Sequence, residues 1–587
     1  MTDVDRRDFL RRAAALAALG VVGCSSTGKP DPTTRAAAAA AAAPTTDAAA
    51  GLGAEDSAAP RMRNNQPAVR ALLVEADQAP LADERMRTLI VRDLANDPLP
   101  QPIATAAGRA RVQLAAGEPI QLAVRLKVPN FGEVYCYADN DGRGYTRPGN
   151  IEFLVDAART RIRRVREAYE RLKPASIPED RQFTHHARMA MRPIPDTGPR
   201  QSRVALAYEN LAHGLHAGER LTLSAARHRI WRMSEPRKEF YFGALASHAD
   251  ARGPEYEKLY RQLFNFSTVS WYTWKNEEPP EQRIDYARMD QSIAWCLDRG
   301  ITPKGFGYVY MSRGATPEWM RPLELPPAPT TRVTTGPIDP SQTRRQFNPR
   351  WPYAKLRDQY VSTVRQTMKR YHGRLIHAEI MNEAHDKANL WHLSHEQVLD
   401  LAKRAFAAAR QGSSTVRRQM NHCCLWAEYA KRANDDGTRR WSPWQFVKAC
   451  QDHGVEYETI GLQLYYPQHD LFEIERMLDR FAAFKKPIHI TEVATASQDG
   501  LDKASMRPST YAPGWHGPWT PTMQADWTEA IYTLCYSKPQ IECVGWWDVA
   551  DAPGHFWPYG GLLDDKLQPK ESYHRLRKLQ QEWGVGR

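Results

Sequence analysis

Two glutamates stand at the ends of strand-like runs that lie far apart in the sequence. Glu383 follows Asn382 at the end of the run LIHAEIMN, and Glu492 ends the run PIHITE. Hydrolysis of a glycosidic bond needs two carboxyl groups, one to protonate the leaving oxygen and one to attack the sugar or activate water. Either glutamate alone is as consistent with a surface residue just past a strand. The pair makes Glu383 and Glu492 candidate catalytic residues.

Residues 236–587 alternate between strand-like and amphipathic helical segments. The strand candidates are Phe240–Ser247, Thr268–Tyr272, Pro303–Met311, Leu375–Met381, Val416–Trp426, Thr459–Tyr466, Pro487–Glu492 and Cys543–Val549. Helical candidates between them include Ala287–Arg299, Tyr353–Tyr371, His395–Arg410, Leu471–Lys485 and Thr522–Tyr536. Strand–helix units in this number predict a (β/α)8 TIM barrel with loop insertions. Its active site would lie at the C-terminal strand ends, so Glu383 and Glu492 are expected to face one cleft.

Residues 69–235 have a different sequence pattern. Short runs that alternate in polarity or are β-branched are separated by turn-rich segments. The strand candidates are Thr88–Arg92, Arg111–Leu114, Ile120–Val128, Val134–Tyr137, Val204–Tyr208 and Arg220–Ser224. One segment, Ile151–Leu172, has apolar residues at helical spacing. This pattern predicts a small β-sandwich domain with a helical insertion before the barrel. The fold alone leaves open whether that domain binds carbohydrate or packs on the barrel as a spacer.

Residues 1–24 are typical of an export signal. Arg6 and Arg7 begin a twin-arginine signature, and an apolar run leads to a lipobox ending at Cys24. We therefore predict twin-arginine export, lipidation of Cys24 and a place in the cell envelope, periplasmic or at the outer surface, with membrane contact only through the lipid anchor. Release by an ordinary signal peptidase is the alternative. Residues 25–68, rich in Ala, Thr and Pro, are interpreted as a linker.

The composition argues against several other classes of protein. The net charge of +12 is dispersed and accompanies no recognition motif, so no nucleic-acid partner is expected. No nucleophile elbow, phosphate loop or dinucleotide fingerprint occurs, which disfavours esterases, kinases and dehydrogenases. No His/Cys cluster has zinc spacing, and we predict neither a metal nor a cofactor.

The cysteines do not form a complete disulfide framework. Of eight in the chain, Cys24 belongs to the lipobox, and the seven others are an odd number. Cys535 and Cys543 are close enough in the sequence to pair across a short loop, which the sequence alone does not decide.

Several short pieces between Lys238 and Arg577 occur in a fixed order. They are Glu277–Tyr286, Gly305–Trp319, Met381–Ala384, Ile460–Gln463, His489–Glu492, Gly545–Leu563 and Gln568–Lys570. In this order they resemble glycoside hydrolase family 10, the retaining endo-1,4-β-xylanases of clan A. The resemblance implies a (β/α)8 barrel that acts on a polysaccharide or oligosaccharide.

The resemblance also implies roles for single residues. Glu383 would be the general acid/base and Glu492 the nucleophile, while Asn382 would hydrogen-bond the sugar 2-hydroxyl and Gln463 would line the cleft. Further substrate-binding candidates are Tyr465, Trp547 and Trp557. Tyr465 stands where the family has a histidine that touches the nucleophile. A retaining mechanism predicts carboxyl groups about 5–5.5 Å apart.

The sequence therefore predicts a retaining glycoside hydrolase of the endo-1,4-β-xylanase type. The alternative is a barrel of little or no turnover that binds glycans at the cell surface, because the second strand carries aromatic residues (VSWYTW, 269–274) where the family grips the sugar with polar ones. A Pro- and Thr-rich insertion, Pro322–Pro349, is expected to wall one end of the cleft.

Overall fold

The computed structural model describes residues 67–585, except 116, 173–179, 247–251, 270–272, 275–283, 325–346, 349–350, 386–387, 433–439, 507–509 and 512–513. The predicted signal with Cys24, nearly all of the predicted linker and most of the Pro/Thr-rich insertion lie outside these residues. Within the described part of the chain, no helix combines the length and the apolar character needed to cross a membrane.

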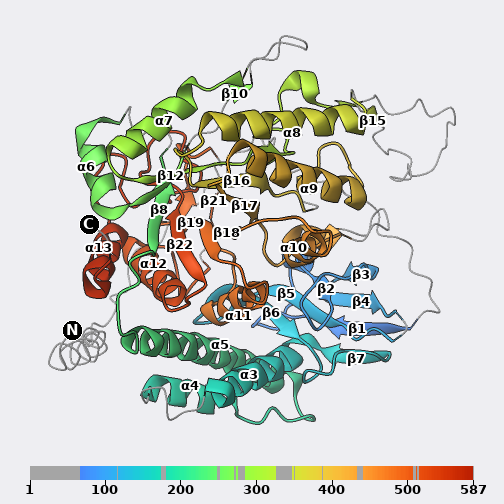
Figure 1. Ribbon diagram of the computed structural model, residues 1–587. Coiled ribbons are helices and arrows are strands. Elements are labelled where there is room, and N and C mark those ends of the chain that lie inside the picture. Colours follow the sequence, from blue (N-terminus) through green and yellow to red (C-terminus); the bar gives the residue numbers. More distant parts are fainter. Residues whose placement is uncertain are drawn as a thin grey trace, which may run out of the picture. The chain divides into compact units, whose positions relative to one another are not determined.

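A closed barrel of parallel strands forms the larger part of the chain (Figure 1). Its strands are β8 (Tyr241–Leu245), β9 (Phe266–Thr268), β12 (Thr302–Gly305) with β13 (Val309–Tyr310), β16 (His377–Asn382), β17 (Arg417–His422), β18 (Thr459–Tyr465), β19 (Ile488–Ala494) and β22 (Ile541–Trp546). Strand β22 pairs with β8, and β12 pairs with both β9 and β16, so the sheet closes on itself. The predicted (β/α)8 barrel is confirmed.

A helix follows each strand position and covers the outside of the barrel (Figure 1). The helices are α6 (Gly253–Leu263), α7 (Ala287–Asp298), α8 (Tyr353–Arg370), α9 (His395–Gly412), α10 (Pro443–Asp452), α11 (Leu471–Ala482), α12 (Pro521–Tyr536) and α13 (Glu571–Trp583). Helices α9 and α10 both begin with a reciprocal capping box, built on Ser394 and Ser442. Because such caps satisfy the first free N–H groups, they fix where each strand-to-helix loop ends.

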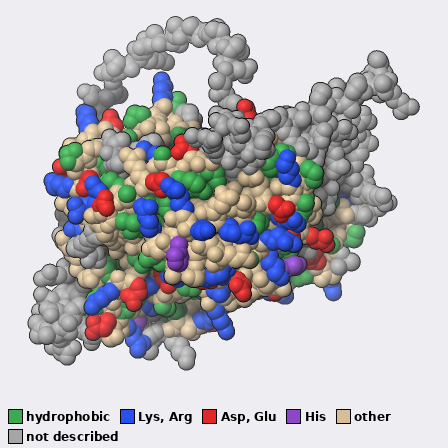
Figure 2. Space-filling model, turned by 45° about the horizontal axis from the view of Figure 1, so that its top comes forward, with side chains coloured by type: hydrophobic (Ala, Val, Ile, Leu, Met, Phe, Trp, Pro, Cys, Tyr) green, Lys and Arg blue, Asp and Glu red, His purple; other side chains and the backbone are tan. Residues whose placement is uncertain are grey.

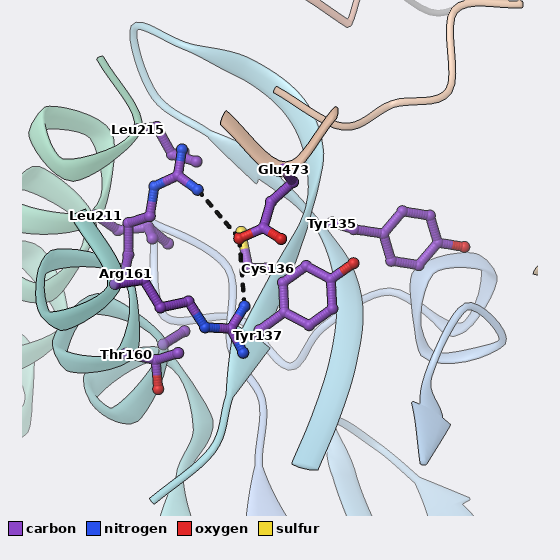
Figure 3. Close-up of a pocket in the computed structure, with 10 residues that line it drawn as sticks. Tyr135, Cys136, Tyr137, Thr160, Arg161, Leu211, Leu215 and Glu473 are labelled. Atoms are coloured by element: carbon purple, nitrogen blue, oxygen red, sulfur yellow. Dashed lines mark hydrogen bonds and ion pairs between the residues drawn. The ribbon is translucent and has the colours of Figure 1, made fainter. Parts of the chain in front are cut away.

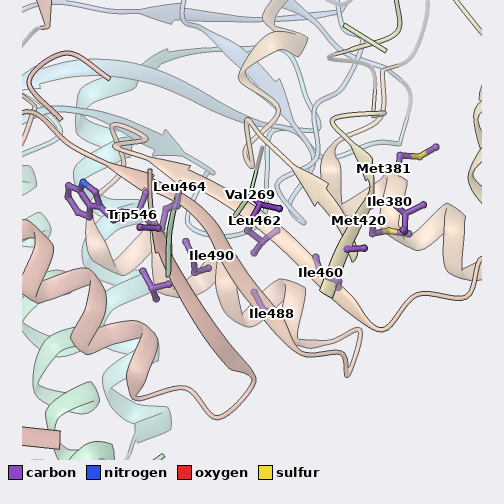
Figure 4. Close-up of a cluster of buried hydrophobic side chains, with 14 of the residues drawn as sticks. Val269, Ile380, Met381, Met420, Ile460, Leu462, Leu464, Ile488, Ile490 and Trp546 are labelled. Atoms are coloured by element: carbon purple, nitrogen blue, oxygen red, sulfur yellow. The ribbon is translucent and has the colours of Figure 1, made fainter. Parts of the chain in front are cut away.

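Apolar side chains fill the layer between strands and helices, whereas the inside of the barrel is polar. Figure 4 shows part of the apolar layer, with Ile460, Leu462 and Ile490 among its fully buried members. On the inside, Lys304 of β12 bonds to Glu379 of β16. Side chains alternate between the two faces of a strand, so one face serves packing and the other can carry chemistry.

Two sheets form the sandwich that precedes the barrel. One has the order β3 (Ile103–Ala106), β4 (Arg109–Gln113), β1 (Ala68–Leu72), β7 (Gly149–Glu152), and the other has β2 (Ile90–Arg92), β5 (Gln121–Val128), β6 (Gly132–Ala138). Both sheets share a buried apolar core with helices α3 (Phe153–Leu172) and α5 (Arg200–Trp231). The predicted β-sandwich with its first helix is confirmed.

Two of the strands predicted for this region are wrong. Val204–Tyr208 and Arg220–Ser224 both lie within the long helix α5, against which α4 (Arg181–Ala190) packs. The buried residues Val204, Tyr208 and Leu211 recur three and four positions apart, which is the period of a helix face. Over five residues that spacing looks like the alternation of a strand, and only the longer window separates the two.

The N-terminal region packs on the barrel through buried charges and stacked rings. Arg161 of α3 bonds to Asp470, which also caps α11, and Arg164 bonds to Glu473 at 3.2 Å. Arg161 also lies 3.5 Å from Glu473 (Figure 3). The ring of His469 stacks on Tyr135 of β6 and on Trp426 from the loop after β17. Packing of this region on the barrel is thus shown.

The cysteines and the surface charges bear on two of the sequence predictions. No disulfide joins any two cysteines of the described residues, so the possible pairing of Cys535 with Cys543 is not formed. On the face in Figure 2, Lys and Arg side chains are interspersed with Asp and Glu and do not gather into one basic patch.

Candidate active site

The two candidate catalytic glutamates lie at the same end of the barrel. Glu383 directly follows β16, and Glu492 lies in the C-terminal half of β19. The strand register pairs Asn382 with Asn421 of β17, and Gln463 of β18 with Glu492. Four neighbouring strands therefore bring carboxyl and amide groups to one level of the barrel mouth.

Three amide side chains connect the two carboxylates. The Oδ1 atom of Asn382 accepts hydrogen bonds from Asn421 Nδ2 at 3.2 Å and from Gln463 Nε2 at 3.3 Å. Gln463 Nε2 also lies 2.9 Å from Glu383 Oε1, and Asn421 Nδ2 lies 3.3 Å from Glu492 Oε1. The structure thus brings Asn382, Gln463 and both glutamates together in one continuous network.

Glu383 has an unusual backbone conformation. Its φ is +51°, in the left-handed region that non-glycine residues seldom adopt, and its N–H donates to the carbonyl of Asn421 at 2.9 Å. Such conformations cost of the order of 1–3 kcal/mol and cluster at functional sites. The hydroxyl of Tyr310 donates to Glu383 Oε2 at 3.1 Å. The half-buried carboxyl group is therefore held by a phenol and an amide.

Glu492 is more deeply buried, with only 4% of its surface exposed. The hydroxyl of Tyr465 donates to Glu492 Oε2 at 2.6 Å. Burial raises the pKa of Glu492 well above its ordinary value, and the negative charge of Glu379 raises it further, while the Tyr465 hydrogen bond and the charge of Lys304 act in the opposite direction. Loss of this group's charge on acidification therefore begins at a higher pH than for an exposed glutamate.

Aromatic rings line the mouth beside Glu492. The ring of Tyr465 stacks on Trp557 with 5.1 Å between centroids and 12° between planes, and it also contacts Phe556. Trp547 lies edge-on to Tyr465 at 6.4 Å and contacts Phe306 at 5.6 Å. Flat rings of this kind bury the faces of sugars well. The structure places both predicted tryptophans around Tyr465, and thereby next to Glu492.

Residues 233–579 match the family model of glycosyl hydrolase family 10. This chain belongs to glycosyl hydrolase family 10. The family 10 region contains both glutamates and every strand of the barrel.

Solved structures of family 10 enzymes are similar to this chain. Native xylanase 10B from Thermotoga maritima is 18% identical, with 62% of this chain and 99% of that chain covered and a TM-score of 0.42. The GH10 structure from Paenibacillus barcinonensis is 18% identical, with 59% and 96% covered and a TM-score of 0.41. No curated protein matches the chain. Membership of family 10 therefore rests on the family model alone.

A buried ion pair lies beneath the two glutamates of this family 10 barrel. Lys304 Nζ is 2.9 Å from Glu379 Oε2 and 3.4 Å from Gln419 Oε1, and Lys304 and Glu379 are 1% and 0% exposed. Burial raises the pKa of Glu379, and the adjacent Lys304 lowers it. Sequence reasoning missed this pair. A charged residue four positions before Glu383, within an otherwise buried strand, was the signal that was available.

Asp548 positions the loop that carries Trp557, one of the predicted substrate-binding residues. Its carboxylate accepts hydrogen bonds from the backbone N–H of Phe556 at 3.0 Å and of Trp557 at 2.7 Å. In the same loop, His555 bonds at 2.8 Å to Asp502, which lies between β19 and α12. In the parts of the chain described here, no three His, Cys, Asp or Glu side chains are arranged to hold a metal ion.

Proposed function

We propose that this family 10 protein is a retaining glycoside hydrolase that cleaves β-glycosidic bonds of a polysaccharide. Glu383 is the general acid/base and Glu492 the nucleophile. The observation that supports this most directly is the amide network, which links two carboxyl groups from strands β16 and β19 at the C-terminal end of the barrel. Active sites of such barrels lie at that end.

In the first step, Glu492 attacks the anomeric carbon while Glu383 protonates the leaving oxygen. The glycosidic bond breaks, and an ester bond between the sugar and Glu492 forms. In the second step, Glu383 removes a proton from water, the water oxygen attacks the anomeric carbon, and Glu492 leaves as a carboxylate. Two inversions give net retention of the anomeric configuration. The Tyr465 hydroxyl and the Asn421 amide orient Glu492 for both steps.

The substrate we propose is a β-1,4-linked xylan or a related polysaccharide. Solved structures similar to this chain are named as xylanases. Asn382 would bind the sugar 2-hydroxyl, and Trp547 and Trp557 would carry the sugar rings. We further propose that the protein is exported by the twin-arginine route and anchored to the cell envelope through a lipid on Cys24.

A hydrolysis screen on defined β-1,4-xylo-oligosaccharides and on β-gluco-oligosaccharides, followed by NMR of the first-formed anomer, tests the mechanism. The β-anomer is expected first, and an α-anomer would overturn retention. A 2-fluoro glycosyl substrate that forms a slowly hydrolysed ester is expected to label Glu492, as located by peptide mass spectrometry. Label at another residue would refute the assignment.

Variants distinguish the enzyme from a glycan-binding barrel without turnover. Glu383→Gln and Glu492→Gln are compared with Glu396→Gln, a change at an exposed position in the first turn of α9. The enzyme assignment requires that only the first two lose activity. If wild type and both variants release equal reducing sugar from every polysaccharide, the glycan-binding alternative replaces it.

A further inference from the structure

Five histidine side chains form one cluster. They come from helix α4 (His185, His186), helix α5 (His213, His216) and the loop before α12 (His516). Neighbouring ring centroids along the cluster lie between 4.9 and 5.7 Å apart. None of these imidazoles takes part in the proposed glycoside chemistry, so their concentration in one place calls for a separate explanation.

One pair in the cluster has a spacing close to that of two ligands of a single ion. The Nδ1 atoms of His186 and His213 are 2.8 Å apart, and their ring centroids are 5.0 Å apart. Two nitrogens that each bind one tetrahedral ion at about 2.0–2.1 Å lie about 3.3 Å from each other. A separation of the two rings by roughly half an ångström would therefore admit an ion between them. Both side chains are half-buried, so an ion can reach them from solvent.

The other three histidines of the cluster differ in whether their rings are already held by hydrogen bonds. His216 is bonded to the carbonyl of Asn130 at 3.0 Å, and His516 is bonded to Glu219 at 2.7 Å. His185 is exposed, with its ring centroid 5.7 Å from that of His213. No group of three ligands is formed within the described residues, so the proposed site needs the exposed His185 side chain to rotate toward the pair.

The charges around the pair are balanced. Arg192 lies near His213 and is bonded to Glu209 at 2.5 Å. Arg220, near His186, lies 3.6 Å from Asp180. Since each arginine has a carboxylate partner, the surroundings do not present an uncompensated positive charge to an incoming cation.

We propose that His186 and His213, joined by His185, bind a divalent transition-metal ion, Cu²⁺ or Zn²⁺, that fastens α4 to α5. Imidazole nitrogens suit both ions, and Cu²⁺ binds such sites most tightly among the first-row divalent metals. The ion would link two helices of the N-terminal region and take no part in catalysis. The proposal is therefore independent of the proposed function.

The test uses the full chain without a polyhistidine tag, titrated with Cu²⁺ and followed by electron paramagnetic resonance. We expect one tight site whose hyperfine pattern shows three imidazole nitrogens. His186→Gln and His213→Gln should each weaken the Kd at least about tenfold, and His185→Gln should weaken it less and remove one nitrogen from the pattern. His228→Gln, also on α5 but packed against Trp231, is the matched control and should leave the Kd unchanged.

Two results would overturn the metal site. One is the absence of stoichiometric Cu²⁺ binding by the wild-type chain. The other is binding that His186→Gln and His213→Gln leave unaltered, which would place the ion elsewhere. Circular dichroism and thermal unfolding in EDTA establish that each variant is folded. If His213→Gln does not fold, the variant at half-buried His186 decides the question.

Discussion

The two glutamates at the mouth of the barrel share one network but have different surroundings. Glu383 is half-buried, just past the end of β16, in a left-handed backbone conformation. Glu492 lies within β19 and is nearly inaccessible. Each accepts one hydrogen bond from a phenol, Tyr310 for the first and Tyr465 for the second, but the bond to Glu492 is shorter, 2.6 Å against 3.1 Å.

This difference matches the two roles that the proposed mechanism assigns. A general acid/base exchanges protons with the leaving group and with water, so it needs access. A nucleophile must be held close to the anomeric carbon, and burial within a strand holds it. The consequence is that burial and the charge of Glu379 raise the pKa of Glu492, although the mechanism needs this group ionised. Lys304 and Tyr465 partly offset that effect.

The largest difference in kcat between variants of the two glutamates should appear when each is replaced by glutamine. Glu492→Gln should reduce kcat by about 10⁵-fold for every substrate, because the covalent step is lost. Glu383→Gln should reduce it by about 10²–10⁴-fold for natural glycosides, and by much less for nitrophenyl glycosides, whose leaving group needs no proton. Steady-state kinetics with both substrate types measures this. Equal losses for both substrates in both variants would contradict the assignment of roles.

The next largest effect is expected from the buried ion pair. Lys304→Met leaves Glu379 without its cation, which should lower the free energy of unfolding by about 3–5 kcal/mol. Because the charge of Lys304 lowers the pKa of Glu492, its loss should also move the acidic limb of kcat/KM to higher pH. Urea unfolding and pH–rate profiles measure the two effects.

Glu379→Gln is the control for this change. It removes the negative charge that raises the pKa of Glu492, so the acidic limb should move to lower pH. Shifts of both variants in the same direction would show that Lys304 and Glu379 act on folding and not on the charge of Glu492.

Replacing the two tyrosines that donate to Glu383 and Glu492 should have a smaller effect on kcat/KM. Tyr465→Phe removes a short hydrogen bond to a charged group, an interaction worth about 1.5–3 kcal/mol, and should lower kcat/KM by about 10–100-fold. Tyr310→Phe removes the longer bond to the more accessible Glu383 and should cost less. Kinetic constants of both variants at the optimum pH test the order. A larger loss for Tyr310→Phe would make Glu383 the more tightly positioned group.

The smallest effect concerns stability. A carboxyl group whose pKa is raised by folding contributes fully below its ordinary pKa and loses that contribution as pH rises through the folded-state value. Ionised Glu492 therefore costs stability at neutral pH, and Glu492→Gln should increase the free energy of unfolding at pH 7 by about 0.5–2 kcal/mol, a common gain when an active-site group is relieved. Thermal unfolding at pH 4 and pH 7 measures it. No gain at pH 7, or an equal gain at both, would contradict the pKa direction.

The sequence predicted the elements whose pattern is local. Parallel barrel strands are buried on both faces, so Thr459–Tyr466 and Pro487–Glu492 appear as short runs rich in apolar residues. The structure has strands at Thr459–Tyr465 and Ile488–Ala494. The end of such a run also marks the barrel mouth, which is why Glu383 was found.

Features that depend on tertiary contacts could not be predicted in this way. The expected strand Pro303–Met311 is broken between β12 and β13, where Gly307 has a φ of +52°. The pairing of Lys304 with Glu379 joins two strands, and nothing in either strand alone identifies the partner. Helix α5 is a different case, because its apolar residues resemble a strand over five residues and show the helical period only over a longer window.

The way the N-terminal region packs on the barrel limits how this protein can be re-engineered. A barrel expressed from its first strand onward would keep Asp470 and Glu473 but lose their partners Arg161 and Arg164. The acidic groups would then lie on an apolar surface newly exposed to solvent. Chimeras that exchange the catalytic barrel should therefore keep the N-terminal region and the barrel together, with the crossover placed before residue 67.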